Sequence, residues 1–144
     1  MELRDSLNQF YYDTTVNDLR QLSRSASGEL SYNSIMYLDV ISFQQEQGHC
    51  TISSLAETLR ISKSAATMKI GELVRLGLIE RTRSDRDRRV VYLTLSGPAA
   101  QALSAYDRPF ERAVRQIESQ FTPAQIETFC TILGTFSLEF GKDF

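Results

Sequence analysis

The chain has 144 residues, of which 42% are hydrophobic and 24% are charged, a composition that predicts a folded globular protein and excludes a disordered one. No apolar run approaches the roughly 20 residues that a membrane-spanning helix needs, and two cysteines, Cys50 and Cys130, are too few for a disulfide framework. The acidic N-terminus lacks the apolar core of an export signal, so we expect a protein of the reducing cytoplasm.

The first part of the chain has apolar residues at helical spacing, which predicts two helices. The first helix covers residues 3–24 and ends where Ser25–Gly28 interrupts the pattern. Ser31 is a suitable N-cap for the second helix, which we expect to end at Gln47-Gly48.

Two shorter helices are predicted next, over residues 52–59 and 63–76. Ser54 and Glu57 have the spacing of a capping box at the start of the first, and Ser62 is expected to cap the second. On a helical wheel the second helix buries one apolar face, formed by Ala66, Ile70 and Leu73.

A basic hairpin follows these two helices. Gly77 ends the preceding helix, and the segments Leu78–Arg83 and Val90–Leu95 have the composition of strands. In the second strand the residues expected to face inward are Val91, Leu93 and Leu95. Two short helices followed by an arginine-rich hairpin predict a winged helix-turn-helix.

The last part of the chain is predicted to be helical. Ser96–Pro98 opens a long helix, because proline is tolerated in a first turn, and Pro109 is expected to kink or divide that helix. Thr122–Gln125 combines a cap, a proline and a capping-box glutamine at the start of the final helix. That helix carries an apolar stripe of Ile126, Phe129, Leu133, Phe136, Phe140 and Phe144.

Charge is unevenly distributed along the chain. The net charge is −2, yet residues 60–90 hold nine basic and four acidic side chains, a local charge of +5, and the remainder carries −7. A basic patch on an acidic body is what local contact with phosphate requires. The alternative is a solvated surface whose charges compensate one another.

Small residues dominate the start of the predicted helix 63–76, which would let its N-terminus lie deep in a major groove. The side chains expected to touch base edges are Ser64, Ala65, Thr67 and Met68. The capped end at Ser62 can meet phosphate with its backbone N–H groups, and the cations expected at phosphates are Lys63, Lys69 and Arg75. The alternative is an ordinary amphipathic helix in a winged helix that does not bind DNA.

The predicted hairpin tip alternates arginines with aspartates. Guanidinium groups at a projecting tip suit a narrow minor groove, and the candidates are Arg86, Arg88 and Arg89. We expect Asp87 to pair with a neighbouring arginine and to fix the shape of the tip. The alternative is a solvated turn whose surface ion pairs contribute little.

These motifs together resemble those of the MarR family of transcriptional regulators, and the resemblance runs nearly end to end. It is carried by Leu30-Ser31, Leu38, Ile41, Leu55-Ala56, Leu59, Ile61–Ser64, Thr67, Leu73, Gly77–Ile79, Asp87–Arg89 and Leu95-Ser96. The chain departs from the family pattern at Ser34, Met68, Gly71 and Ser84. The departures leave the fold untouched and bear on which bases are read.

The resemblance implies a mainly α fold with a small β-hairpin wing. It implies a single MarR-like domain over residues 1–144, with dimerisation helices in 1–28 and 97–144 and a DNA-binding winged helix-turn-helix in 30–96. It also implies that Asp87 and Arg89 hold the wing tip and touch DNA. The expected function is that of a homodimeric repressor, relieved by a small ligand, on a pseudo-palindromic operator in double-stranded DNA. The alternative is a winged-helix module for protein–protein interaction that never touches DNA.

The resemblance also implies a dimer interface and an effector pocket. The interface would use Leu3, Leu7, Phe10, Phe129, Leu133, Phe136 and Phe140, whose alternative role is an intramolecular core. A pocket for a small aromatic or anionic effector would use Tyr11, Tyr12, Arg20, Tyr32, Met36 and Tyr37, which could equally be core residues.

Other functions have little support in the sequence. The single histidine, His49, and the lack of clustered ligands predict neither a metal site nor a cofactor. No motif of an enzyme is present, so we expect no catalysis. Thiol sensing has weak support: Cys130 is expected to be buried, whereas Cys50 lies near a helix start that could lower its pKa.

Overall fold

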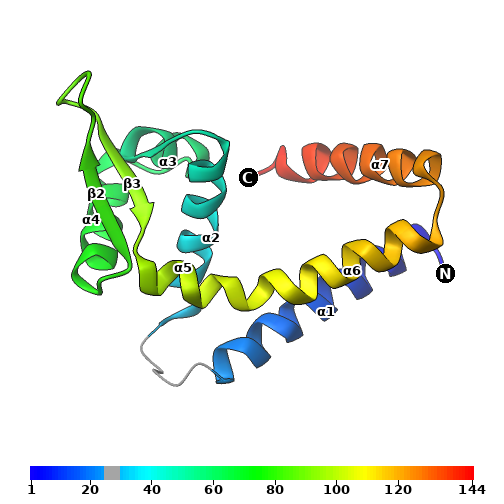
Figure 1. Ribbon diagram of the computed structural model, residues 1–144. Helices are drawn as coiled ribbons and strands as arrows, with labels where there is room; N and C mark the ends of the chain where they lie inside the picture. The colour runs from blue at the N-terminus through cyan, green and yellow to red at the C-terminus, as the bar shows by residue number, and fades with distance from the viewer. Residues whose placement is uncertain (25–29) are drawn as a thin grey trace. The chain divides into compact units, whose positions relative to one another are not determined.

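The computed structural model describes residues 1–24 and 30–144 and confirms a mainly helical fold with a small sheet (Figure 1). The chain forms two compact units, Met1–Ala100 and Gln101–Phe144. The predicted break at Ser25–Gly28 lies outside the described residues. Within the described part of the chain, no helix is both long and apolar enough to cross a membrane.

The first two helices match their predictions. Helix α1 covers Leu3–Arg24 and helix α2 covers Tyr32–Gln47. The Ser31 hydroxyl caps α2 by accepting a hydrogen bond from Ser34 N at 3.1 Å. Gly48, at φ 152°, ends the helix as predicted.

Helix α3, Ile52–Leu59, begins with a different capping box from the predicted one. Thr51 Oγ1 accepts from Ser54 N at 3.0 Å, and Ser54 Oγ accepts from Thr51 N at 2.9 Å. The predicted pairing of Ser54 with Glu57 is therefore wrong, because Ser54 already lies inside the first helical turn. The extended backbone of Thr51 supplies the cap instead.

The turn between α3 and helix α4, Lys63–Arg75, is closed by two backbone hydrogen bonds. Ile61 N donates to Ala56 O at 3.1 Å, and Arg60 N donates to Glu57 O at 3.2 Å, with Arg60 left-handed at φ 53°. This is the hydrogen-bond pattern of a Schellman motif, formed here without glycine. It fixes the direction in which the chain enters α4.

The same motif ends α4. Leu78 N donates to Leu73 O at 2.9 Å and Gly77 N donates to Val74 O at 3.0 Å, with Gly77 at φ 72°. The predicted end of this helix at Gly77 is confirmed.

The sheet has three antiparallel strands in the order β1-β3-β2. Strands β2, Ile79–Arg83, and β3, Val91–Leu95, form the predicted hairpin, which is drawn as paired arrows in Figure 1. The sequence did not predict β1, Cys50–Thr51, because two residues carry no periodicity. The pairing of Cys50 with Leu93 makes β3 the central strand.

The core of the first unit lies between α2, α3, α4 and β3. The predicted buried face of α4 is confirmed, and the fully buried side chains include Leu38, Ile41, Leu55, Ala66, Ile70, Leu73 and Leu93. The predicted alternation along β3 holds only for Leu93, because its neighbours on both faces are half-buried. Tyr92, expected to face outward, stacks on His49 with ring centroids 4.2 Å apart.

The predicted long helix after Ser96 is divided. Helix α5, Gly97–Leu103, passes through a short 3-10 segment, Ser104–Tyr106, into helix α6, Asp107–Gln120. The division precedes Pro109 because proline cannot donate to the carbonyl four residues earlier, and its ring crowds that carbonyl. The carbonyl in question belongs to the 3-10 segment.

Helix α7, Pro123–Gly141, has the predicted capping box. Thr122 Oγ1 accepts from Gln125 N at 3.2 Å, and Gln125 Oε1 accepts from Thr122 N at 2.9 Å. No residue of α7 is buried within the chain.

Candidate nucleic-acid interface

The first half of α4 presents small side chains on an open face. Ser62 Oγ accepts from Ala65 N at 3.0 Å and so caps the helix. Because Ala66, Ile70 and Leu73 hold the opposite face in the core, the residues left exposed are Lys63, Ser64, Ala65, Thr67 and Met68. Met68 is 76% exposed. The predicted base-reading residues therefore share one accessible stretch of helix.

Lys69 is held against the protein rather than extended into solvent. Its Nζ donates to Ser34 Oγ at 3.2 Å, lies 3.5 Å from Glu72 Oε2, and sits 5.5 Å from the centre of the Tyr37 ring. The side chain is only 15% exposed. These contacts tie α4 to α2, which favours a structural role over the predicted phosphate contact.

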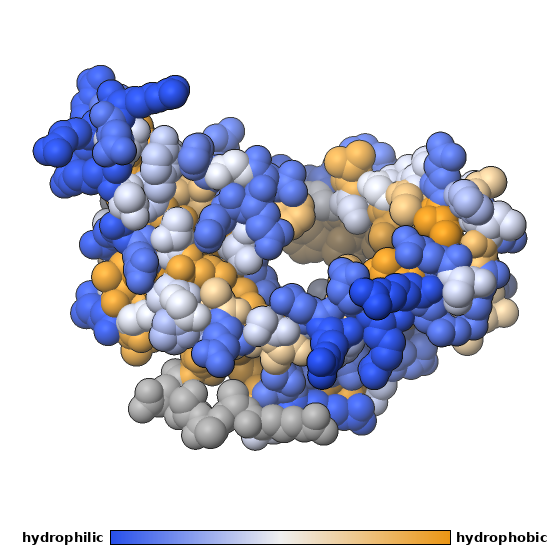
Figure 2. All heavy atoms as spheres, viewed as in Figure 1, coloured by the Kyte–Doolittle hydropathy of each residue, from blue (hydrophilic) through white to orange (hydrophobic). Residues whose placement is uncertain are grey.

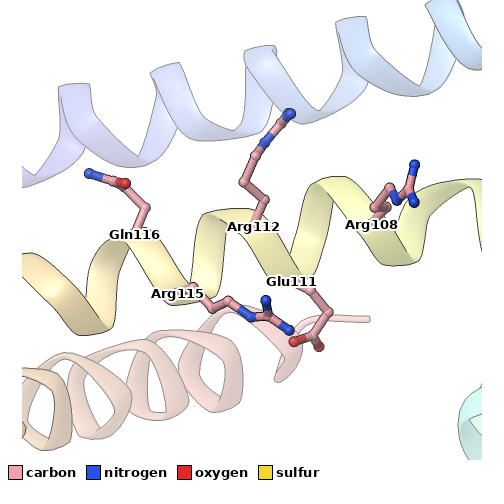
Figure 3. Close-up of a pocket in the computed structure, with 5 residues that line it drawn as sticks. All are labelled: Arg108, Glu111, Arg112, Arg115 and Gln116. Atoms are coloured by element: carbon pink, nitrogen blue, oxygen red, sulfur yellow. The ribbon is translucent and has the colours of Figure 1, made fainter.

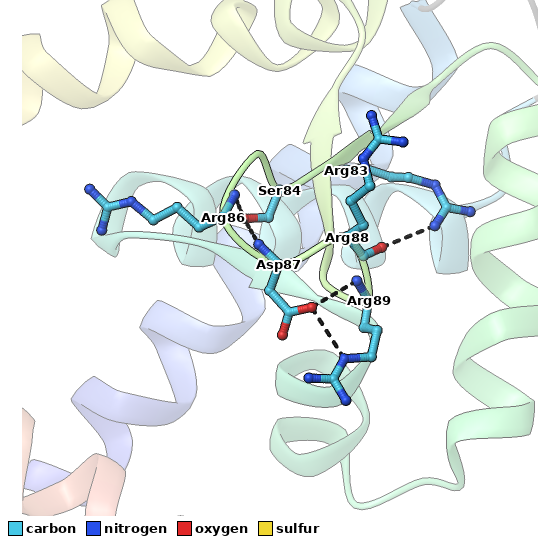
Figure 4. Close-up of polar contacts among 6 residues, drawn as sticks. All are labelled: Arg83, Ser84, Arg86, Asp87, Arg88 and Arg89. Atoms are coloured by element: carbon cyan, nitrogen blue, oxygen red, sulfur yellow. Dashed lines mark hydrogen bonds and ion pairs between the residues drawn. The ribbon is translucent and has the colours of Figure 1, made fainter.

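The tip of the β2–β3 hairpin is built around the hydroxyl of Ser84. Its Oγ accepts hydrogen bonds from the N–H groups of Arg86 at 3.2 Å and Asp87 at 3.4 Å (Figure 4). Ser84 N donates to Val90 O at 2.9 Å, and Val90 N donates to Asp87 O at 3.0 Å. Ser84 itself is buried. These bonds give the tip one defined shape.

Asp87 also orders the arginines of the tip. Its Oδ1 accepts from the backbone N of Arg89 at 3.0 Å and from the side-chain Nε of Arg89 at 3.2 Å. Arg83 Nη1 donates to the carbonyl of Arg88 at 3.0 Å, and Arg86 points away from this group (Figure 4). The expected pairing of Asp87 with a neighbouring arginine is confirmed.

The arginines of the tip are open to a partner. The Arg89 side chain is 91% exposed despite its ion pair, and Arg86 and Arg88 are exposed as well. Figure 2 shows this tip, at the upper left, as a projection covered by hydrophilic residues. An exposed ion pair of this kind adds little to global stability, so its main effect is to orient the guanidinium group.

Two residues near the interface escaped the sequence prediction. Ser84 stands where the MarR pattern often has an acid, and a hydroxyl can accept the same backbone N–H groups as a carboxylate. A serine immediately before a polar turn is the signal that could have revealed it. Arg81 lies on β2 beside α4, and its place depends on a contact between elements that no local pattern encodes.

The residues predicted for an effector pocket are only partly brought together. A cavity of about 270 Å³ lies between α2 and the α3–α4 turn, and its lining residues are Asn33, Met36, Tyr37, Val40, Leu59 and Ile61. Met36 and Tyr37 are the predicted residues that line it. Tyr11, Tyr12 and Arg20 are exposed on α1. The Tyr32 hydroxyl donates to Asp18 Oδ2 at 3.4 Å.

Two acidic residues lie near Tyr32 at the start of α2. Desolvation raises the pKa of the Asp39 carboxyl, and the nearby Asp18 carboxylate raises it further. Desolvation also raises the pKa of Tyr32, with Asp18 as the next cause. Negative charge beside Tyr32 disfavours an anionic ligand at this tyrosine.

A second hollow lies along α6 in the other unit. It has a volume of about 450 Å³, and its lining residues are Arg108, Glu111, Arg112, Arg115 and Gln116. Arg112 and Gln116 point to one side of the helix, and Arg115 and Glu111 point to the other (Figure 3). Because all five belong to one helix, this is a charged groove rather than an enclosed ligand chamber.

The predicted dimer residues are largely uncovered. Exposed fractions are 61% for Phe10, 60% for Phe129 and 56% for Phe140, and Leu3, Leu133 and Phe136 are exposed too. Leu7 is half-buried. Phe136 and Phe140 stack with ring centroids 5.6 Å apart. Among the described residues, α7 therefore forms no part of an intramolecular core.

The cysteines differ from their expected environments. Cys50 is 1% exposed, and burial raises the pKa of its thiol, although a hydrogen bond with Ser54 acts in the opposite direction. The expected lowering of the Cys50 pKa by a helix start is therefore wrong. Cys130 is exposed, not buried, like the rest of α7, which has no buried residue in the described structure. In residues 1–24 and 30–144, no group of three or more potential metal ligands occurs.

Comparison with known proteins identifies the winged helix. Residues 30–90 match the MarR family. The chain is 30% identical over 87 residues to the HTH-type transcriptional regulator YwhA of Bacillus subtilis, covering 60% of this chain and 63% of that protein. It is 32% identical over 89 residues to the transcriptional regulator AdcR of Streptococcus pneumoniae, covering 58% and 61%. The matches thus span less than two thirds of either relative.

A solved structure extends the similarity of fold to the whole chain. FabT of Streptococcus pneumoniae, crystallised in complex with DNA, superposes with a TM-score of 0.71 over 96% of this chain and 94% of that one, at 23% identity. At this identity the likeness establishes the fold. Residues 30–90 therefore match the MarR family, and the whole chain has the fold seen in FabT.

Proposed function

We propose that the protein is a sequence-specific DNA-binding transcriptional regulator of the cytoplasm, acting as a homodimeric repressor. The observation that carries this proposal is the open first half of α4 combined with an arginine-bearing wing whose shape is set by Ser84 and Asp87. The DNA complex of FabT and the names of the two relatives as transcriptional regulators support it.

In this function α4 enters the major groove. Hydroxyl groups of Ser64 and Thr67 can donate to or accept from base edges, and the side chain of Met68 can contact a thymine methyl group. Lys63 meets a backbone phosphate. Substitutions on this face change which sequence is bound.

The wing enters the adjacent minor groove. Its arginines favour a narrow groove, where the electrostatic potential is most negative. Asp87 offsets one positive charge but orients Arg89, and an oriented guanidinium group loses less entropy on binding. The wing therefore contributes affinity and shape recognition more than base recognition.

Dimerisation uses the apolar faces of α1 and α7, and residues 1–28 and 97–144 form the dimerisation region in this proposal. Exposed aromatic side chains of this number are rare on monomers and are readily covered by a two-fold copy. Two recognition helices spaced by one turn of DNA, roughly 34 Å, then read a pseudo-palindrome.

A small ligand relieves repression by favouring one spacing of the recognition helices over another. The cavity beside Met36 and Tyr37 is mainly apolar and touches the turn before α4. A neutral aromatic compound fits this mainly apolar cavity better than an anion, because burying a charge without a partner is costly.

Binding rather than catalysis is the proposed activity. The single histidine, His49, is exposed and stacks on the Tyr92 ring, and no acidic or basic side chain pairs with it among the described residues. A protein–protein interaction module remains the second candidate, favoured by the 76% exposure of the apolar Met68 side chain.

The deciding experiment is a fluorescence-anisotropy titration of the protein against DNA flanking its own gene and against a scrambled duplex, at several salt concentrations. Tighter binding to the flanking DNA, weakened steeply by salt, supports the regulator. Equal binding to both duplexes contradicts sequence specificity at that site. No binding at low salt favours the interaction module.

A further inference from the structure

Two arginines from different elements converge over Gly71, in the middle of α4. A Cβ atom placed on this glycine would lie 3.6 Å from Nη1 of Arg75 and 3.8 Å from Nη2 of Arg81. Arg75 belongs to the last turn of α4, whereas Arg81 belongs to β2. The two guanidinium groups therefore share one small area of surface, although five residues separate them in sequence.

This arrangement places like charges together in the folded protein. Both arginines are exposed, and the ion pairs found among the described residues lie elsewhere, at Lys69–Glu72, Asp87–Arg89 and Glu139–Lys142. Two convergent guanidinium groups without a carboxylate repel each other, and an external anion removes that repulsion. Planar guanidinium donors match phosphate oxygens in geometry.

The pair lies on the same side of α4 as the base-reading residues. Ser64, Met68, Gly71 and Arg75 are spaced by four, three and four residues, which places them on one stripe. Arg75 is roughly 16 Å further along the helix axis than Ser64. A helix lying in the major groove with its N-terminal half against the bases would bring this end to the DNA backbone.

We propose that Arg75 and Arg81 form a clamp for one backbone phosphate of DNA, and that Gly71 keeps this clamp free of a competing side chain. The proposal rests on the DNA-binding function proposed above. An acidic residue at position 71 would lie between the two guanidinium groups, pair with them and cancel their charge. The glycine at this departure from the family pattern thus gives the protein an additional phosphate contact.

The test compares Gly71→Glu with Gly71→Ala. An alanine Cβ meets both arginines at ordinary contact distances and removes a glycine from a helix interior. Gly71→Ala should therefore melt at a higher temperature and bind operator DNA as the wild type does. Gly71→Glu should bind operator DNA about tenfold or more weakly than the wild type does. Its plot of log affinity against log salt should be shallower, by about the amount that one to two phosphate contacts contribute.

Arg81→Gln is an independent test of the clamp, because this exposed side chain can be shortened without disturbing the core. It should make the plot of log affinity against log salt shallower by about the amount expected for one phosphate contact. It should also weaken binding to all duplexes alike. In the Gly71→Glu background, Arg81→Gln should have little further effect. Arg112→Gln removes the same charge from α6, which lies in the proposed dimerisation region and outside the DNA interface, so its sedimentation is compared with that of the wild type. An Arg112→Gln protein that sediments as the wild type does should bind operator DNA with unchanged affinity.

The outcomes separate this clamp from the wider function. Specific binding by the wild type, with unchanged affinity and salt slope in both Gly71→Glu and Arg81→Gln, overturns the clamp and leaves the regulator standing. Absence of DNA binding by the wild type overturns both. If an Arg112→Gln protein with wild-type sedimentation loses as much affinity as Arg81→Gln, the effect is one of general charge and the clamp is also overturned.

Discussion

At the scale of single residues, the wing depends on one hydroxyl group. Ser84 Oγ accepts from two backbone N–H groups at the tip. Ser84→Ala leaves both donors without this acceptor and frees the tip, at a cost to global stability of about 1 kcal/mol or less because the tip is close to solvent. We expect weaker DNA binding and faster amide hydrogen exchange at Arg86 and Asp87.

The control for this prediction is Ser84→Asn, whose side-chain carbonyl can accept the same backbone N–H groups without adding charge. Ser84→Asn should retain most of the DNA affinity. If Ser84→Ala binds DNA as tightly as the wild type, the preformed tip has no part in recognition.

Asp39 makes stability depend on pH. Desolvation and the neighbouring Asp18 raise the pKa of its carboxyl above the unfolded value. Asp39 therefore adds stability below its unfolded pKa of about 3.9, and this contribution is lost as the pH rises through the folded pKa. Asp39→Asn should raise the urea midpoint at pH 7 and lose this advantage near pH 3.5.

Glu46→Gln is the matched control, because Glu46 is an exposed acid near the end of the same helix. Its effect on the urea midpoint at pH 7 should be smaller than that of Asp39→Asn. An equal gain from Asp39→Asn at pH 7 and pH 3.5 contradicts the linkage to ionisation.

At the scale of elements, the end of α4 sets where the wing begins. Gly77 holds φ at 72°, a left-handed conformation that costs a residue with a Cβ about 1–2 kcal/mol. Gly77→Ala should destabilise the protein by about that amount in urea denaturation. No atom lies within 4 Å of the added methyl group, so the whole loss is conformational.

Gly97→Ala serves as the comparison, since Gly97 lies at the start of α5 with equally open space around it and no positive φ. It should be neutral or stabilising. A similar loss for both variants would show that the left-handed conformation of Gly77 is not the cause.

The elements were predictable where local chemistry defines them. Helix periodicity, the caps at Ser31, Ser62 and Thr122, and the terminating Gly77 fixed the helices to within a residue or two. Strand β1 escaped prediction because two residues form a strand only through pairing with β3. The Thr51 cap escaped because it depends on the extended backbone which that pairing imposes.

The candidate site likewise has parts that local sequence predicts and parts that it does not. The segments that form it, the start of α4 and the wing, carry their own composition and were predicted from it. The contact of Lys69 with Ser34 joins residues 35 positions apart, and the convergence of Arg75 with Arg81 needs α4 packed on β2. Such contacts follow from tertiary packing, which a local pattern does not contain.

At the scale of the whole molecule, the exposed apolar stripe of α7 makes association the central question. Phe136, Phe140 and Phe144 form a ladder with ring centroids 5.6 Å and 5.4 Å apart. Phe140 is 56% exposed within the single chain. Aromatic rings of this size dominate the energy of an interface when they are covered, so a charge in the ladder should oppose dimer formation.

Phe140→Glu should therefore sediment as a monomer at concentrations where the wild type sediments as a dimer. Its affinity for a two-half-site operator should fall by orders of magnitude, because each monomer holds only one recognition helix, whereas weak binding to an isolated half-site should persist. Phe43→Glu, at a residue 64% exposed on α2 and outside the ladder, should leave association unchanged. A Phe140→Glu protein that remains dimeric would place the interface elsewhere, and loss of half-site binding would show that the charge had damaged the winged helix itself.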